Sequence, residues 1–162
     1  MRGYLRGAQT IALVVGVVIL AGVPPGFAQA AKPFVGVWEL DRFKSAYDPI
    51  GTAPEKRIVT LEAAGDGIKS TARTWRNAVA ADVTYTAGFD GKDYPTAAPG
   101  ATVSFKRVNA TTIERTAKLN GTVAETQTWS VSPDGKTMTI KASGTDAAGT
   151  PFSSTQIYTK TS

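Results

Sequence analysis

A two-residue alternation of apolar and polar side chains, repeated from Val35 almost to the C-terminus, constrains the fold of this chain more than any other feature. The alternating runs are rich in Val, Ile, Thr, Tyr and Trp, and none shows a convincing helical period. Because successive side chains of a β-strand point to opposite faces, such runs are typical of strands with one buried face. The pattern predicts strands over residues 35–41, 57–63, 68–75, 79–89, 102–108, 112–119, 123–131, 137–143 and 152–160.

Tight turns separate most of these strands. Gly65-Asp66-Gly67, Asn120-Gly121 and Pro133-Asp134-Gly135 are typical of hairpins, since glycine and asparagine tolerate the positive φ angles that match the twist of paired strands. Short connections place each strand antiparallel beside its predecessor, and pairing of the last strand with the first would remove both exposed edges. The predicted fold is therefore an all-β, antiparallel up-and-down barrel of about eight to ten strands. Residues 42–55 and 91–100 contain several prolines and glycines and are predicted to be loops.

The first thirty residues differ in composition from the rest of the chain. Arg2 and Arg6 precede an unbroken run of apolar residues and glycine over residues 11–23, and Ala28-Gln29-Ala30 offers the small side chains that a signal peptidase needs. We expect residues 1–30 to be a signal peptide cleaved near Ala30, and residues 31–162 to form one exported domain, periplasmic or secreted. The alternative is an uncleaved anchor, but the apolar run is short compared with the roughly twenty residues of a membrane-spanning helix.

Cysteine and histidine are both absent, which excludes several kinds of site. Without them the chain can form no disulfide, thiol nucleophile, Ser-His triad, histidine-ligated haem or usual zinc site. Removing the two arginines of the predicted signal peptide lowers the net charge from +5 to +3, a mild and dispersed excess that does not indicate nucleic acid binding. We expect no metal, no cofactor and no membrane-spanning segment in the processed chain, and we expect it to be a monomer.

The alternation also sorts the side chains of each strand by face. Residues 79–89 have one apolar and one polar face, so the apolar face is predicted to point into the barrel. That face consists of Val79, Ala81, Val83, Tyr85, Ala87 and Phe89. The same test places Arg107 and Arg115 on the inward faces of adjacent strands. An inward guanidinium must find a partner or an anion, because an unpaired buried charge is costly.

Two short segments resemble the calycin superfamily, the lipocalins and the fatty-acid-binding proteins. They are Phe34-Val35-Gly36-Val37-Trp38-Glu39-Leu40 at the start of the predicted barrel and Gln156-Ile157-Tyr158-Thr159-Lys160 at its end. The resemblance implies a lipocalin-like barrel in which Trp38 plugs the closed end. It also implies that Gln156 and Tyr158 point into the cavity, where the family's corresponding residues bind a carboxylate or hydroxyl.

The chain departs from that family in several respects. Residues 43–53 are too short and too rich in proline for the two-helix lid of the fatty-acid-binding proteins, and the disulfide and C-terminal helix of typical secreted lipocalins have no counterpart. The chain looks most like small exported bacterial proteins described only as lipocalin-like. For those proteins the resemblance implies a fold and no established activity.

The candidate ligand-binding residues are the inward polar and aromatic side chains. They are Arg107, Arg115, Gln156, Tyr158, Tyr85 and Trp129. Arg107 and Arg115, together with Gln156 and Tyr158, would form a polar cluster suited to the head group of an amphipathic acid. The alternatives are that Arg115 pairs with Glu125 on the next strand, that both arginines reach to the rim, and that the tryptophans only fill the core.

Three functions compete for this sequence. The first is a binding protein of the cell envelope that holds a small apolar or amphipathic molecule inside the barrel. The second is a solid barrel that acts through its outer surface as a structural or protein-interaction module. The third is an enzyme with Glu125 and Tyr158 as an acid-base pair, which we do not expect because no spacing in the sequence demands it.

Overall fold

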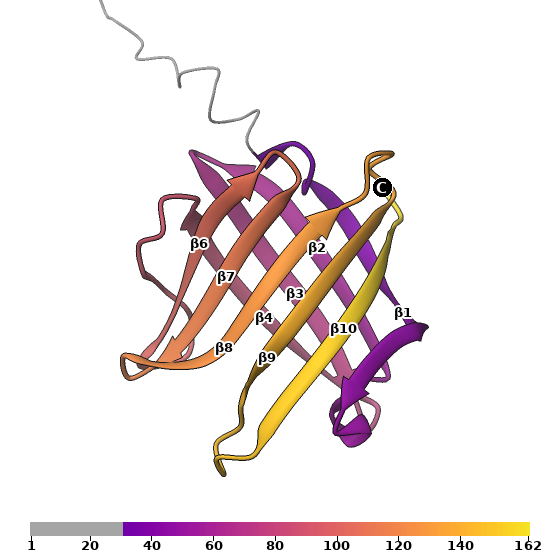
Figure 1. The fold of residues 1–162 in the computed structure, drawn as a ribbon, viewed down its shortest axis with the longest axis vertical. Coiled ribbons are helices and arrows are strands. Elements are labelled where there is room, and N and C mark those ends of the chain that lie inside the picture. The colour runs from indigo at the N-terminus through magenta and orange to yellow at the C-terminus, as the bar shows by residue number, and fades with distance from the viewer. Residues whose placement is uncertain (1–30) are drawn as a thin grey trace, which may run out of the picture.

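A computed structural model describes residues 31–162, and the predicted signal peptide lies outside the described residues. Ten strands and one short 3-10 helix make up this part of the chain (Figure 1). None of the helices in residues 31–162 is long and apolar enough to cross a membrane. The elements are β1 (Gly36–Asp48), η1 (Ile50–Thr52), β2 (Lys56–Ala64), β3 (Gly67–Arg76), β4 (Val79–Gly88), β5 (Tyr94–Pro95), β6 (Ala101–Asn109), β7 (Thr112–Leu119), β8 (Thr122–Val131), β9 (Thr137–Thr145) and β10 (Pro151–Lys160).

The strands form a single antiparallel sheet that curls into a nearly closed barrel, which confirms the predicted all-β, up-and-down fold. The order across the sheet is β4-β3-β2-β1-β10-β9-β8-β7-β6-β5, so the first and last strands pair as predicted. The prediction that this pairing removes both edges is wrong. In the described part of the chain, no hydrogen-bonded ladder joins β4 to β5 or β6, and a seam remains between them.

Residues 42–55 are not simply a loop, because β1 continues to Asp48. The register between β1 and β10 shifts between Asp41 and Ala46, so that residues 42–45 oppose the single residue Gln156. The Ser45 hydroxyl donates to the Asp41 carbonyl at 2.7 Å and accepts the Ile157 amide at 2.9 Å, which bridges this bulge. The strand can resume because a side-chain oxygen replaces a missing backbone partner. Residues 91–100 likewise contain a two-residue strand, β5.

One end of the barrel is packed shut by aromatic side chains. Trp38 is fully buried, and its indole Nε1 donates to the Phe34 carbonyl at 2.7 Å. The Lys160 ammonium lies 5.3 Å from the centre of the Trp38 ring. The Phe34 ring lies 6.4 Å from that of Phe89, which in turn makes an edge contact with Phe105 at 6.2 Å. Trp38 therefore fills the closed end, as the resemblance implied.

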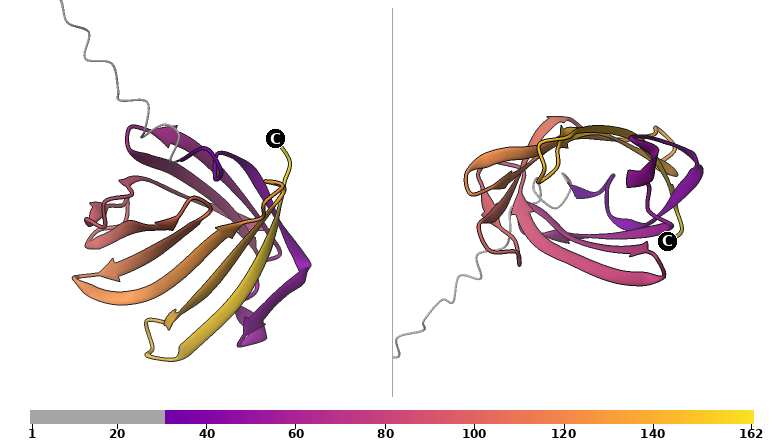
Figure 2. Two further views of the ribbon diagram at one scale, coloured as in Figure 1. Left: turned by 45° about the horizontal axis from the view of Figure 1, so that its top comes forward. Right: turned by 90° about the horizontal axis from the view of Figure 1, so that it is seen from below.

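The opposite end is open, and Figure 2 (right) looks at the barrel from that side. Three apolar residues near this end belong to the inward set yet remain about half exposed or more: Val79 (68%), Val83 (51%) and Leu119 (49%). On β4, only Tyr85 and Ala87 of the predicted inward face are deeply buried among residues 79–87. The two-residue period predicted the face correctly, but the first half of that face borders the open mouth and the seam.

Candidate functional site

Polar side chains lie in the middle of the barrel, between the aromatic plug and the mouth. Arg115 on β7 donates from Nε to the Tyr85 hydroxyl at 3.0 Å, and from Nη1 to Glu125 Oε2 at 3.0 Å. Its guanidinium also lies 5.4 Å from the centre of the Tyr85 ring. The Arg115 side chain is 12% exposed and that of Glu125 is 25% exposed. Arg115 therefore faces the interior and pairs with Glu125 at the same time.

This ion pair is electrostatically balanced. Burial lowers the pKa of the Arg115 guanidinium, but the charges and hydrogen bonds of Tyr85 and Glu125 outweigh burial and leave that pKa raised. Arg115 thus stays charged, and Glu125 supplies its counter-ion. Removing one partner of such a pair leaves an uncompensated charge in a poorly solvated place.

A second polar group lies on β10, where residues two apart share a face. The fully buried Tyr158 hydroxyl donates to Gln156 Oε1 at 2.7 Å, and Gln156 Nε2 donates to the Ser154 hydroxyl at 3.0 Å. Burial raises the pKa of Tyr158, with the charge of Arg57 opposing this shift and the charge of Glu125 adding to it. The Tyr158 hydroxyl is therefore a neutral donor that is already occupied by Gln156.

Trp129 belongs to the packed interior. Its indole Nε1 donates to Gln127 Oε1 at 2.6 Å, and its ring makes an edge contact with Phe105 at 5.4 Å between centroids. Both Trp129 and Gln127 are buried. The polar atom of the indole is thus satisfied within the protein.

Arg107 is not brought to the other candidate residues. Its guanidinium lies 4.9 Å from the centre of the Phe89 ring, at the closed end of the barrel. Nη1 donates to the carbonyls of Asn109 and Ala110 at 3.2 and 3.3 Å. Burial lowers the pKa of Arg107. The predicted cluster of two arginines with Gln156 and Tyr158 therefore does not form: Arg107 lies at the closed end, and Arg115 bonds to Tyr85 and Glu125.

A cavity of about 290 Å³ opens at the mouth of the barrel. It reaches Glu125 and Gln156, so it touches both internal polar groups. Pro54 and Phe152 contribute apolar surface, and charged side chains lie around the opening. The full lining is Tyr47, Thr52, Pro54, Arg57, Arg76, Glu125, Asp146, Phe152, Ser154 and Gln156.

Sequence analysis missed Arg57 and Tyr47 in this lining. Arg57 could have been found, because it lies two residues before the inward Val59 and therefore shares its face. Tyr47 could not have been found, because the bulge at residues 42–45 resets the alternation of β1 and brings an odd-numbered residue inward after the even-numbered Trp38 and Leu40.

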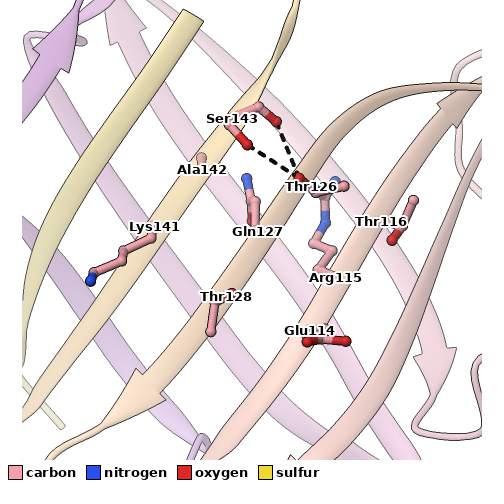
Figure 3. Close-up of a pocket in the computed structure, with 9 residues that line it drawn as sticks. All are labelled: Glu114, Arg115, Thr116, Thr126, Gln127, Thr128, Lys141, Ala142 and Ser143. Atoms are coloured by element: carbon pink, nitrogen blue, oxygen red, sulfur yellow. Dashed lines mark hydrogen bonds between the residues drawn. The ribbon is translucent and has the colours of Figure 1, made fainter.

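A larger hollow, of about 450 Å³, lies against strands β7, β8 and β9 (Figure 3). Most of its lining side chains belong to the outward set of these strands: Glu114, Thr116, Thr126, Thr128, Lys141 and Ser143. The Thr126 and Ser143 hydroxyls already bond to one another at 3.3 Å. This hollow is a polar groove on the outer surface, and it differs in character from the mouth cavity.

Comparisons with known proteins identify the fold. No family model matches the chain, and no curated relative matches it. Among solved structures, the fatty acid binding protein of Schistosoma mansoni in complex with arachidonic acid is 14% identical with a TM-score of 0.54, covering 82% of this chain and 99% of that one. The chain has a calycin-like fold. Zebrafish ileal bile acid-binding protein complexed with cholic acid is also similar, at 13% identity and a TM-score of 0.48, over 79% of this chain and 98% of that one.

This calycin-like barrel carries its own elements after the first strand. Where the resemblance to fatty-acid-binding proteins implied a pair of helices, the chain has the bulge at residues 42–45, the second half of β1 and the three-residue η1. Tyr47 on this segment lines the mouth cavity. The segment therefore supplies part of the wall at the open end.

Proposed function

We propose that this chain is a binding protein that holds a small amphipathic molecule at the open end of its barrel. The observation that carries the proposal is the mouth cavity of about 290 Å³, which ends on buried polar groups inside an otherwise apolar barrel. Ligand pockets in proteins commonly measure about 300–1,000 Å³ and combine apolar walls with a few fixed polar groups. The mouth cavity has that composition and lies near the lower end of that range.

The two polar groups beneath the cavity support binding because they are already oriented. Arg115 is held by Tyr85 and Glu125, and Gln156 is held by Tyr158 and Ser154. Side chains fixed by such bonds lose little conformational freedom when a ligand arrives. Val79, Val83 and Leu119, which are about half exposed or more, give the same end of the barrel an apolar rim.

One structural neighbour also supports the proposal. The Schistosoma mansoni protein, which shares the fold at low identity, was solved in complex with arachidonic acid. Binding also fits the interior better than acid-base catalysis does. Glu125 accepts from Arg115, and the Tyr158 hydroxyl donates to Gln156, so each member of the acid-base pair considered above is engaged by another residue.

Export completes this proposal. The composition of residues 1–30 supports a signal peptide cleaved near Ala30, which would place the binding protein in the periplasm or outside the cell. Amino-terminal sequencing of the protein recovered from its host would start at about Ala31 if this is right. Recovery of a chain that still begins at Met1 would contradict export by this route.

Native mass spectrometry of the protein from its own host tests binding directly. We expect a small molecule to co-purify with wild type and to be absent from the Ser154→Phe variant. Ser154 lines the cavity, so a phenylalanine there would fill the mouth. Ser153→Phe is the matched control, since Ser153 is the exposed neighbour on the outward face of β10. A wild-type protein that carries no molecule and binds neither octanoate nor octanol would overturn the proposal and favour the solid-barrel alternative.

A further inference from the structure

The polar side chains inside the barrel fall into two classes, satisfied and unsatisfied. Arg115, Gln127, Gln156 and Tyr158 all have hydrogen-bond partners within the protein. Arg57 differs from them. Within residues 31–162, its side chain makes no hydrogen bond or ion pair, and its buried Nε has no partner.

Arg57 faces the interior because of its register on β2. It shares a face with Val59 and Leu61, which are 2% and 1% exposed, and it lines the mouth cavity. A partly buried guanidinium without a counter-ion is unfavourable unless something else supplies the missing charge and acceptors. The position of Arg57 therefore favours the binding of an anion at the mouth.

Tyr47 presents a second unsatisfied group to the same cavity. Its hydroxyl is buried and has no hydrogen-bond partner among the described residues. Burial is the main cause that raises the pKa of Tyr47 to about 12, while the charge of Arg57 opposes the shift. The hydroxyl is therefore protonated at neutral pH and can donate to an acceptor. Tyr47 opposes Ser154 across the β1–β10 ladder, so it lies at the same level as the cavity floor on β10.

The other charged groups around the cavity are already engaged. Arg76 donates to the Thr52 carbonyl at 2.6 Å, and Glu125 accepts from Arg115. The Asp146 carboxylate accepts the amides of Ala148 and Thr150 at 2.9 and 2.8 Å. The two carboxylates thus have donors of their own, whereas Arg57 and Tyr47 are donors that lack an acceptor. An anion, rather than a cation, would satisfy this site.

We propose that Arg57 and Tyr47 form an anion site that holds the carboxylate of the bound molecule at the mouth of the barrel. The inference rests on the proposed binding function and specifies its ligand as an amphipathic monocarboxylate. The site is distinct from Gln156 and Tyr158, which the resemblance implied as the carboxylate partners and which bond to each other instead. Guanidinium and hydroxyl donors together match the two oxygens of a carboxylate.

The size of the cavity limits the ligand. At about 290 Å³ the cavity lies near the lower end of the range for ligand pockets, so a short-chain molecule is the appropriate size of probe. Octanoate has that size, and octanamide is its neutral counterpart of nearly the same shape. The alkyl chain would lie against Pro54 and Phe152, the apolar part of the lining.

Calorimetric titration of the protein, residues 31–162, with octanoate and with octanamide tests the anion site. We expect wild type to bind octanoate at least about tenfold more tightly than octanamide, because a charge-assisted hydrogen bond contributes more than a neutral one. Arg57→Gln should weaken octanoate by about ten- to a hundredfold and leave octanamide within about twofold. Arg57→Lys should retain part of the preference, and Tyr47→Phe should weaken octanoate by only a few fold.

Arg73→Gln is the matched control. Arg73 lies on the outward face of β3 beside Trp75 and Asp82, so its replacement removes the same charge without touching the cavity. Equal binding of the two probes to wild type, unchanged by Arg57→Gln, would overturn the anion site and leave the binding function standing. Binding of neither probe, with no co-purifying molecule, would overturn both. Circular dichroism of each variant checks that it is folded.

Discussion

The two ends of the barrel show how one sheet can be both a stable core and an open site. At the closed end, Trp38, Phe34 and Phe105 are fully buried and the indole of Trp38 is satisfied. At the mouth, inward-facing valines are exposed and Arg57 and Tyr47 carry polar atoms without partners. The comparison indicates that the closed end supplies the stability that lets the mouth keep polar groups without partners.

The largest expected effect comes from opening the closed end. Trp38→Ala should lower the free energy of unfolding by about 3–5 kcal/mol, because it removes a fully buried aromatic side chain and leaves a cavity. Trp75→Ala is the control, since Trp75 lies on the outer face between Lys56 and Arg73 and should cost about 1 kcal/mol or less. Urea denaturation measures both. Equal losses of stability in the two variants would contradict a special packing role for Trp38 at the closed end.

Breaking the internal ion pair should have the next largest effect. Glu125→Gln should cost about 2–3 kcal/mol in urea denaturation, because it leaves the guanidinium of Arg115 largely buried without a counter-ion. Replacing both partners with Arg115→Met and Glu125→Leu should recover most of the loss. Glu62→Gln, which breaks the exposed pair with Lys69, should change stability by less than about 0.5 kcal/mol. A similar cost for Glu62 and Glu125 would show that the interior pair is solvated like a surface pair.

The two-residue period predicted the walls of this barrel well and its ends poorly. It placed Tyr85 and Arg115 on faces that the structure finds inward, whereas the inward position of Gln156 and Tyr158 was implied by the family resemblance. Parity specifies the face of a residue but not its height along the barrel axis. Arg107 follows the parity of the inward Phe105, yet it lies at the end of β6, beside a register shift between Arg107 and Asn109, and reaches Phe89 at the closed end.

The seam and the bulge were beyond prediction for a related reason. Both depend on which backbone groups find partners across the sheet, and local alternation carries no information on that. The bulge at residues 42–45 relies on the Ser45 hydroxyl, which joins Asp41 to Ile157, a residue more than a hundred positions away in sequence. Tyr47 enters the cavity because this bulge resets the alternation of β1, so its position in the lining could be found only in three dimensions.

The ionisation of Tyr47 at the mouth of the barrel should make the stability of the protein depend on pH. The ordinary pKa of a tyrosine is about 10, and burial raises that of Tyr47 to about 12. The unfolded chain therefore loses this proton at a lower pH than the folded protein does. The contribution of the protonated Tyr47 to the free energy of unfolding is complete below about pH 10 and is lost as the pH rises toward 12. In urea denaturation over this window, Tyr47→Phe should lose less stability than wild type. If wild type and Tyr47→Phe lost the same stability over this pH range, the Tyr47 hydroxyl would be solvated.

The smallest expected effect compares two valines in one row across the sheet. Val59 opposes Ala72, which opposes Val83, so the three residues share a level and a face. Val59 is 2% exposed, whereas Val83, on the strand at the seam, is 51% exposed. Val59→Thr should cost about 1–3 kcal/mol by burying a hydroxyl, and Val83→Thr less than about 0.5 kcal/mol. Equal costs would mean that the seam beside β4 closes in solution and buries Val83. In that case the open end of the barrel would be narrower in solution than in this structure. A ligand that enters would then have to separate β4 from its neighbours.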